Sequence, residues 1–441
     1  MTHASALPFV ADFERVAATL PGSGTPWLAR LRREALERFA ARGIPTRREE
    51  AWKHTSLAAL EKTVFTAQPA GFERPVAPAE AEALAFDGLE SHRLVFVDGR
   101  YVPALSRVGE LPPGVVLRTV GEMLAVAPAG LAPFLAPPSG ATVFFDLNTA
   151  FMSDGLYLRL ARGAVVPDPI HLIFVATAAG HAVHPRNVVV AEAGAQATII
   201  EHYAGGDAAG FTNAVTRLEA GDGASIEHYR VQHEGPQALH IGAVHATQAR
   251  ASRLHSHSVA LGAALSRTDI TTSFDAEACD ATLDGLYVVA GRQHVDHHTR
   301  IDHAQPHGTS REHYRGVLDG TARGVFNGKV VVHAGAQKTD ARQANHNLLL
   351  SRGAEIDSQP QLEIYADDVK CTHGATVGQL DAQQLFYLRS RGIDEAAARG
   401  LLIHAFARSV IERVRLAPVR ARLEQLLASR LARPDLIAEL T

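Results

Sequence analysis

The first part of the chain carries apolar residues at helical spacing. In the stretches 13–20 (FERVAATL) and 27–43 (WLARLRREALERFAARG), apolar side chains recur every three or four positions, as in amphipathic helices. Gly43 and Pro45 are expected to end the second helix. We therefore predict a helical N-terminal region over residues 1–85. Residues 86–140 are rich in Pro, Ala and Gly with short strand-like pieces, which predicts a mixed connecting region.

The pattern changes between residues 141 and 380. Short stretches that alternate apolar and polar residues are separated by Gly, Asp or Asn, and no long helical pattern interrupts them. The segment 192–205 (EAGAQATIIEHYAG) resembles 219–232 (EAGDGASIEHYRVQ), at a spacing of about 26 to 27 residues, and EHYRG recurs at Glu312. Such a repeat is typical of a solenoid of stacked strands. Periodicity alone leaves an ordinary β-sandwich equally open.

Helical spacing returns in residues 381–441. The stretch 381–392 (DAQQLFYLRSRG) predicts one helix closed by Gly392, and Asp394 is placed to cap the next. The apolar positions of the last two helices are Ile403, Phe406, Ala407, Val410 and Val414, followed by Val419, Leu423, Leu426 and Leu427. These helices are expected either to pack on the β-region or to bind another protein.

Composition narrows the function classes. Lys and Arg number 43 against 47 Asp and Glu, so neither a nucleic-acid footprint nor a lipid-binding basic run is expected. Two cysteines far apart provide no disulfide framework and no CxxC site, which fits a reducing cytosol. No apolar run approaches the roughly 20 residues of a membrane span, and the start of the chain has no export signal pattern. We expect a cytoplasmic protein without a membrane anchor.

Cys371 and His373 lie two residues apart in a strand-like stretch, 367–380 (DDVKCTHGATVGQL). In an extended strand such residues share one face, about 6.5 Å apart at their Cα atoms. A thiolate and an imidazole suit iron or zinc, but stable sites usually need four ligands. Because the pair ends the β-region, where a sheet edge is open, it could be half of a site completed by a partner. A packed thiol beside a hydrogen-bonded histidine is the alternative.

A second group of chemistry-bearing residues is a run of six histidines between 294 and 313. They are His294, His297, His298, His303, His307 and His313. A self-contained metal-dependent enzyme on a solenoid is one hypothesis, although no HExxH or HxHxDH spacing is present. Polar stacking between rungs is the simpler interpretation. The glycine-rich stretch 324–331 (GVFNGKVV) fails as a phosphate-binding loop, and no orienting group marks Cys371 as an enzymatic nucleophile.

Residues 324–402 closely resemble the core of the SufB/SufD family of iron–sulfur cluster assembly proteins. The motifs that carry the resemblance are 339–351 (TDARQANHNLLLS), 362–371 (LEIYADDVKC), 373–378 (HGATVG) and 385–393 (LFYLRSRGI), with 297–310 (HHTRIDHAQPHGTS) upstream. Gly374 and the stretch 45–55 (PTRREEAWKHT) make the sequence most similar to the SufD branch. The low cysteine count agrees with that branch, since SufB is the subunit expected to carry the cluster-forming thiols.

The resemblance implies a right-handed parallel β-helix with helical N-terminal and C-terminal regions. It implies pairing with SufB through the end of the β-helix, with His373 as a transient metal-site residue shared with SufB and Cys371 beside it. It also implies docking of the ATPase SufC on the C-terminal helices, in a segment that includes Phe386, Tyr387, Leu388, Arg391, Gly392, Leu402 and Phe406. ATP hydrolysis then belongs to SufC, and this chain holds no stable cofactor alone, only a transient iron–sulfur cluster or its iron and sulfide in the complex. A homodimer is one alternative when SufB is absent.

Overall fold

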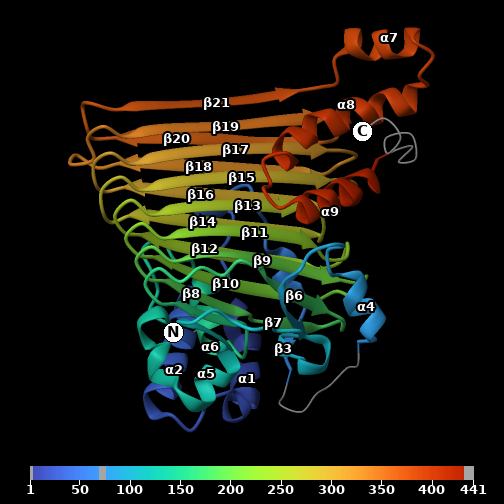
Figure 1. Cartoon of the computed structure of the whole chain (residues 1–441). Coiled ribbons are helices and arrows are strands. Elements are labelled where there is room, and N and C mark those ends of the chain that lie inside the picture. Colours follow the sequence, from blue (N-terminus) through green and yellow to red (C-terminus); the bar gives the residue numbers. More distant parts are fainter. Residues whose placement is uncertain (1–2, 69–75, 432–441) are drawn as a thin grey trace.

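The computed structural model describes residues 3–68 and 76–431 of the chain (Figure 1). Its centre is a parallel β-solenoid, and helical regions lie at both ends, which confirms the mainly β fold expected from the sequence. Residues 432–441 of the predicted C-terminal region lie outside the described residues. Within the described ranges, no helix is both long and apolar enough to cross a bilayer.

Two sheets form the solenoid. The first contains β1 (Thr66–Ala67), β4 (Val115–Thr119), β5 (Leu156–Leu160), β7 (His181–Val183), β8 (Arg186–Ala191), β10 (Phe211–Ala220), β12 (Leu239–Gln248), β14 (Leu265–Phe274), β16 (His294–His303), β18 (Arg323–Val332) and β20 (Glu355–Ile364). The second contains β2 (His92–Val97), β3 (Arg100–Tyr101), β6 (Ile170–Ala176), β9 (Gln196–Gly205), β11 (Ser225–His233), β13 (Arg253–Ala260), β15 (Asp280–Val289), β17 (Thr309–Leu318), β19 (Asp340–Leu349) and β21 (Lys370–Gly378). From β8 onward successive long strands alternate between the sheets, so each pairs in parallel with strands of the adjacent coils.

The register of the coils differs from the repeat seen in the sequence. Glu201 pairs with Arg230, whereas the repeat aligned it with Glu227, three residues earlier. Because side chains alternate between faces, an odd offset moves a residue to the opposite face. Glu201 accordingly lies buried inside the solenoid, and Glu227 lies on the outer face. The repeat therefore marked the solenoid correctly but not its rungs.

Inward-pointing side chains fill the solenoid with a continuous apolar core. Two of them, Tyr287 on β15 and Tyr314 on β17, each lie beside a glycine of the neighbouring strand, Gly316 and Gly285 respectively. A Cβ atom at either glycine would collide with the adjacent aromatic ring. Glycine is therefore required at both positions for the rings to pack in adjacent coils.

The expected connecting region, residues 86–140, contributes to the solenoid. Its strands β2, β3 and β4 join the first coils, where β3 pairs antiparallel with β2 and β4 pairs antiparallel with β5. Such pairing satisfies backbone groups that the first coil would otherwise leave open. One helix, α6 (Val143–Phe151), lies inside the sequence range expected to be β-structure.

Most of the N-terminal helices cover the outer face of the first sheet. Besides α6, this end of the molecule contains α1 (Leu7–Val16), α2 (Pro26–Arg42), α3 (Ala58–Lys62), α4 (Pro78–Ala83) and α5 (Val120–Val126), of which α4 packs instead against β2 and β6 of the second sheet. Phe9, Phe39 and Trp52 pack with Phe211 of β10 and Leu239 of β12 in one apolar cluster. Helix α2 ends before Gly43, which has φ +71°, as its glycine predicted.

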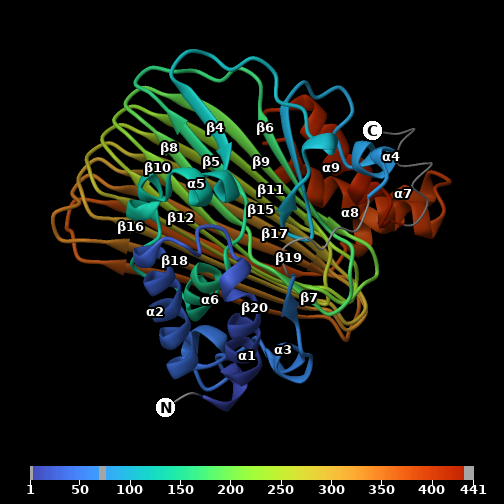
Figure 2. The same cartoon turned by 90° about the horizontal axis from the view of Figure 1, so that it is seen from below.

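The C-terminal helices cover the outer face of the second sheet (Figure 2). The covering helices are α8 (Glu395–Ile411) and α9 (Ala417–Ala428), and α7 (Ala382–Ser390) precedes them without a buried residue. The apolar positions expected on α8 and α9 do face the sheet, where they meet Tyr229, Val259 and Val317. The Asp394 carboxylate accepts a hydrogen bond from the backbone N–H of Ala397, which confirms the predicted cap. Helix α7 projects past the last coil (Figure 1).

Candidate functional site

The last coil of the solenoid is open. Strands β20 and β21 end the two sheets, and within the described residues no strand pairs with their outer edges. The side chains that continue the inward-pointing rows of β18 and β19 stand at this end without a further coil above them. Two of them are apolar and exposed, Ile364 at 41% and Val377 at 54%.

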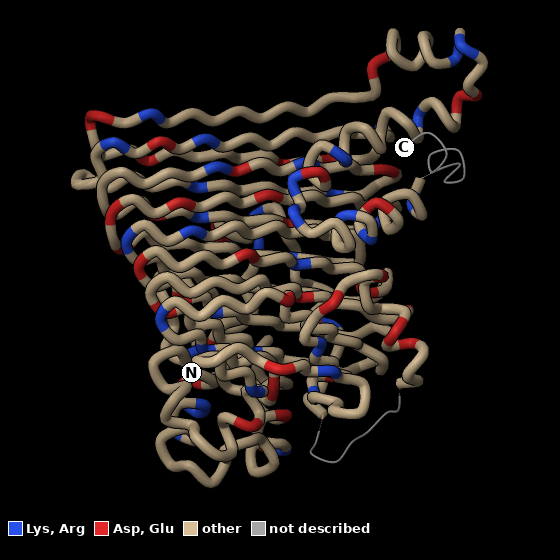
Figure 3. Tube along the Cα trace, viewed as in Figure 1, with Lys and Arg blue, Asp and Glu red and all other residues tan. Residues whose placement is uncertain are grey.

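Strand β21 also lacks the charges that usually block edge-to-edge association. After Lys370 it carries no Lys, Arg, Asp or Glu, whereas charges of both signs are interspersed along the other coils (Figure 3). Natural sheet edges are commonly protected by charged side chains, prolines or covering segments. The uncharged β21 edge is therefore suited to pairing with another chain.

Cys371 and His373 both belong to this open end. They pair in register with Ala341 and Gln343, two inward-facing positions of β19, so both continue the inward row. Cys371 is half-buried against the apolar cluster of Val330 and Ala341, and His373 is exposed. Burial raises the pKa of the Cys371 thiol, which therefore stays protonated at neutral pH.

A polar column continues inward from His373. Gln343 donates a hydrogen bond from Nε2 to the Glu312 carboxylate one coil further down. Burial raises the pKa of Glu312 to about 7, because desolvation outweighs the opposing effect of the neighbouring Thr299 hydroxyl and of the Gln343 hydrogen bond. The carboxyl group beneath the open end is thus poised to change its charge near neutral pH.

Amide and hydroxyl groups extend this polar interior beside the column. Asn345 donates to Tyr287 at 3.1 Å and accepts from Ser358 at 2.7 Å and from Asn347 at 2.6 Å. Neither this network nor a role for Glu312 follows from the motifs named above. A signal was present in the stretch QANHN, because Gln343, Asn345 and Asn347 occupy alternate positions and so share one face of β19.

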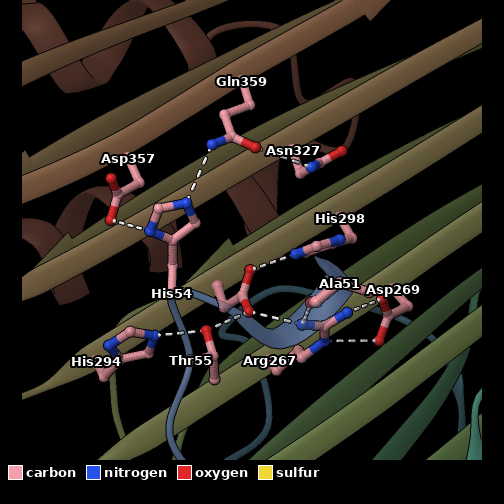
Figure 4. Close-up of polar contacts among 11 residues, drawn as sticks. Ala51, His54, Thr55, Arg267, Asp269, His294, His298, Asn327, Asp357 and Gln359 are labelled. Carbon is pink, nitrogen blue, oxygen red and sulfur yellow. Dashed lines mark hydrogen bonds and ion pairs between the residues drawn. The ribbon is translucent and has the colours of Figure 1, made fainter. Parts of the chain in front are cut away.

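The stretch 45–55, which carried no evident chemistry in the sequence, docks on the outer face of the first sheet (Figure 4). The Arg267 guanidinium lies over the Trp52 ring, with its Cζ atom 3.7 Å from the ring centroid. Arg267 and Thr55 both donate to the buried Asp296, at 2.9 Å and 2.5 Å. Burial raises the pKa of Asp296, but His298 and Arg267 together hold it well below its usual range.

The same N-terminal stretch reaches the edge of the open end (Figure 4). His54 contacts the Asp357 carboxylate at 2.9 Å and the Gln359 side-chain amide at 3.0 Å. Both partners lie on β20, the terminal strand of the first sheet. The N-terminal region therefore helps to position one strand of the open coil.

The six histidines of the 294–313 run do not converge. Four of them lie on β16, where His294 and His298 point outward into the Figure 4 network while His297 and His303 point inward. His307 lies in a turn with φ +61°, and His313 lies on β17. In the part of the chain that the structure describes, none of the six belongs to a group of three metal-ligating side chains. The glycine-rich stretch 324–331 forms β18 and no phosphate loop.

The residues expected to bind SufC differ in how far they are exposed. Phe386 and Tyr387 are 74% and 56% exposed on α7, where Arg391 stacks on the Tyr387 ring. Leu388 and Leu402 are half-buried, and Gly392 is exposed in the turn after α7. Phe406 instead anchors α8, because the Arg315 guanidinium lies 4.6 Å from its ring centroid and donates to its carbonyl at 2.7 Å.

These features define a solenoid protein whose last coil is open and carries side chains suited to a soft metal. Residues 174–406 match the family model described as SUF system FeS cluster assembly, SufBD core domain, and residues 4–172 match the SufBD protein N-terminal region. The chain therefore belongs to the SufBD family of iron–sulfur cluster assembly proteins.

Curated relatives cover nearly all of the chain. It is 35% identical to the iron–sulfur cluster assembly SufBD family protein slr0076 of Synechocystis, over 94% of this chain and 93% of that protein. It is also 35% identical to the iron–sulfur cluster assembly protein SufD of Escherichia coli, over 86% of this chain and 88% of that protein. The chloroplastic protein ABCI7 of Arabidopsis thaliana is 26% identical over 92% of the chain. Within its family, the chain is SufD-like.

Proposed function

We propose that this chain is a cytosolic, non-enzymatic subunit of an iron–sulfur cluster assembly complex, in which it pairs with SufB and with the ATPase SufC. The observation that carries the proposal is the open last coil with its Cys371 and His373. A self-contained solenoid protein would cover this end, because unpaired backbone groups and exposed apolar side chains favour association.

Pairing through β21 would cover both kinds of exposed group. A partner strand would satisfy the free backbone donors and acceptors of β21, and a partner coil would cover Val377 and Ile364. The absence of charges from Cys371 to Gly378 removes the usual electrostatic obstacle. We assign SufB to this position, in line with the family resemblance.

His373 would serve at the shared site as a transient ligand for iron or for a nascent cluster. Its imidazole is exposed at the interface, and cysteine thiolates from SufB would supply the ligands that this chain lacks. Cys371 is the weaker candidate, because burial keeps its thiol protonated until a cation approaches. The cluster is then the cargo of the complex, and no cofactor stays with this chain alone.

The C-terminal helices would receive SufC. Phe386 and Tyr387 offer exposed aromatic surface on α7, which is the kind of surface that anchors protein interfaces. Helix α8 continues from this surface to Arg315 of β17 through Phe406. A movement driven by ATP hydrolysis in SufC could thus be passed to the solenoid as a shift between conformations.

The decisive experiment measures iron and acid-labile sulfide in the complex co-expressed with SufB and SufC and purified without oxygen. We expect His373→Ala to lower both contents severalfold while the three subunits still co-purify. The matched control is His346→Ala, because His346 lies on β19 beside the same edge but on the opposite face. Undiminished iron and sulfide in the His373 variant would remove this residue from the site and leave the chain a structural partner.

A further inference from the structure

A separate group of metal-ligating side chains lies on the outer face of the second sheet. His255 and His257 occupy alternate positions of β13 and therefore share a face, and Asp284 is the register partner of His257 on β15. One ligand atom from each of the three lies within 4.8 Å of the others. All three side chains are buried, beneath the C-terminal helices and remote from the open end.

His257 is the observation that points to a ligand. It is 1% exposed, and neither ring nitrogen has a hydrogen-bond partner among the described residues. A buried polar group without a partner is costly, so such groups in native proteins usually meet water, an ion or another ligand. The carboxylate of Asp284, its register neighbour, supplies the negative charge that a cation requires.

The surroundings of His255 match those of a metal-binding histidine. Its Nε2 atom shares a hydrogen bond of 2.9 Å with Asp284 Oδ2, which a bound ion would replace, and its Nδ1 atom lies 3.4 Å from Glu227 Oε1 on β11 without a hydrogen bond among the described residues. Metal-ligating imidazoles commonly turn one nitrogen to the ion and donate from the other to a carboxylate. Glu227 is therefore placed to orient His255 while Nε2 faces an ion held by Asp284.

We propose that His255, His257 and Asp284 form a binding site for a divalent first-row transition-metal ion, Zn²⁺ or Fe²⁺. Two imidazoles and one carboxylate are a common ligand set for both ions, with the remaining positions taken by water. This site is independent of the pairing through the open end. Its occupancy requires no residue of β21.

Binding of the ion is coupled to the C-terminal helices through Arg413. The Arg413 guanidinium, in the connection between α8 and α9, donates to Asp284 Oδ1 at 2.7 Å. Arg415 of the same connection contacts Glu227 at 3.2 Å. An ion at Asp284 competes with Arg413 for the same carboxylate. A bound ion therefore weakens the contact between Arg413 and Asp284, and a firm contact between Arg413 and Asp284 lowers the affinity for the ion.

The test is titration of the metal-free full chain with Zn²⁺ and, without oxygen, with Fe²⁺. The chain carries the background substitutions Cys371→Ser and His373→Ala, so that the open end cannot contribute ligands. We expect about one ion per chain, and at least a tenfold loss of affinity in both His257→Ala and Asp284→Asn. The ion with the higher affinity is then assigned as the metal of this site.

The matched control is His245→Ala. His245 is likewise buried on an outer sheet face with both ring nitrogens unpartnered in the described chain, but it lies on β12 of the first sheet. Its replacement should leave the affinity unchanged. Arg413→Ala removes the competing cation and should raise the affinity severalfold.

Three results would overturn the assignment. The first is that the background chain binds no stoichiometric metal ion. The second is that the folded His257→Ala and Asp284→Asn variants bind the ion as tightly as the background chain does. The third is that His245→Ala loses as much affinity as these two variants. Circular dichroism and thermal unfolding establish folding for each variant. Should His257→Ala not fold, His257→Gln provides the same comparison, because its amide retains polar atoms near the site but is a poor metal ligand.

Discussion

Buried carboxylates in one solenoid interior have opposite protonation behaviour because their neighbours differ. Burial raises the pKa of Glu312 to about 7, since its neighbours Thr299 and Gln343 are neutral groups. Burial also acts on Glu201, but His228, Thr216 and Arg230 reverse its effect and hold the pKa at about 2. Residue type and burial are the same in the two cases, so the partner alone decides the charge.

Glu312→Gln is expected to stabilise the protein above pH 7. Between pH 4.5 and about 7, folded Glu312 keeps a proton that the unfolded chain has lost, so wild-type stability falls as pH rises through this range. The glutamine variant lacks this decline, and its advantage should reach about 3 kcal/mol at pH 8 and vanish below pH 4.5. Urea unfolding of both proteins at several pH values provides the measurement.

Glu201→Gln is the matched control for that experiment. Its low folded-state pKa contributes stability above pH 4.5, so replacement should destabilise the protein at pH 7, opposite in sign to Glu312→Gln. If both variants shifted stability in the same direction at pH 8, the assigned charge of Glu312 would be wrong.

At the scale of elements, the C-terminal helices differ in what they bury. Helices α8 and α9 place Ile403, Val410 and Leu423 against the second sheet, as the helical spacing of these residues predicted. Helix α7 has no buried residue. The Asp381 side chain caps its N-terminus, and the chain turns after its C-terminus at Gly392, which has φ +84°. Its sequence therefore specifies a helix, while its aromatic residues Phe386 and Tyr387 are largely exposed.

Replacing Phe386 and Tyr387 by Ser should separate binding from folding. Both side chains are largely exposed, so the free energy of unfolding should change by less than about 0.5 kcal/mol. Binding to SufC, measured by surface plasmon resonance with the intact chain, should weaken at least tenfold. Val126→Ser on α5 is the control, because Val126 is 75% exposed at the other end of the molecule. Unchanged SufC binding in the double variant would place the docking surface elsewhere.

On the scale of the whole molecule, the two ends of the solenoid are unlike. The first coil is flanked by the antiparallel strands β3 and β4, whereas the last coil presents β20 and β21 directly to solvent. Stacked coils each bury their neighbour's inner face, so an end without a terminal covering element leaves one set of inward side chains exposed. This asymmetry gives the molecule one end that is ready to associate.

The isolated chain should dimerise through that end when SufB is absent. Sedimentation velocity at micromolar concentration is expected to show a dimer that Val377→Lys converts to monomer, because a charge on β21 opposes edge pairing. The thermal unfolding midpoint of the monomeric Val377→Lys variant should stay close to that of the wild-type protein at a concentration where the dimer has dissociated. Val116→Lys on β4 places the same charge at the opposite end and should keep the dimer. A dimer that persists in the Val377 variant would exclude the open end as its interface.

The amino-acid sequence by itself determined the local structure and the family. Helical spacing located α2, α8 and α9, and alternation with a repeat indicated stacked strands. The two-residue spacing of Cys371 and His373 placed them on one face, because side-chain direction in a strand depends only on position along it. These features are local, and so sequence analysis could reach them.

Only the tertiary structure decided which residues meet across coils. Glu312 and Gln343 lie in different strands, Thr55 reaches Asp296 across 241 positions, and Arg413 reaches Asp284 across 129. Such contacts depend on the length of every intervening turn, and one odd offset transfers a residue to the other face, as Glu201 and Glu227 demonstrate. Side-chain direction is encoded residue by residue, whereas the register between coils is a property of the whole folded chain.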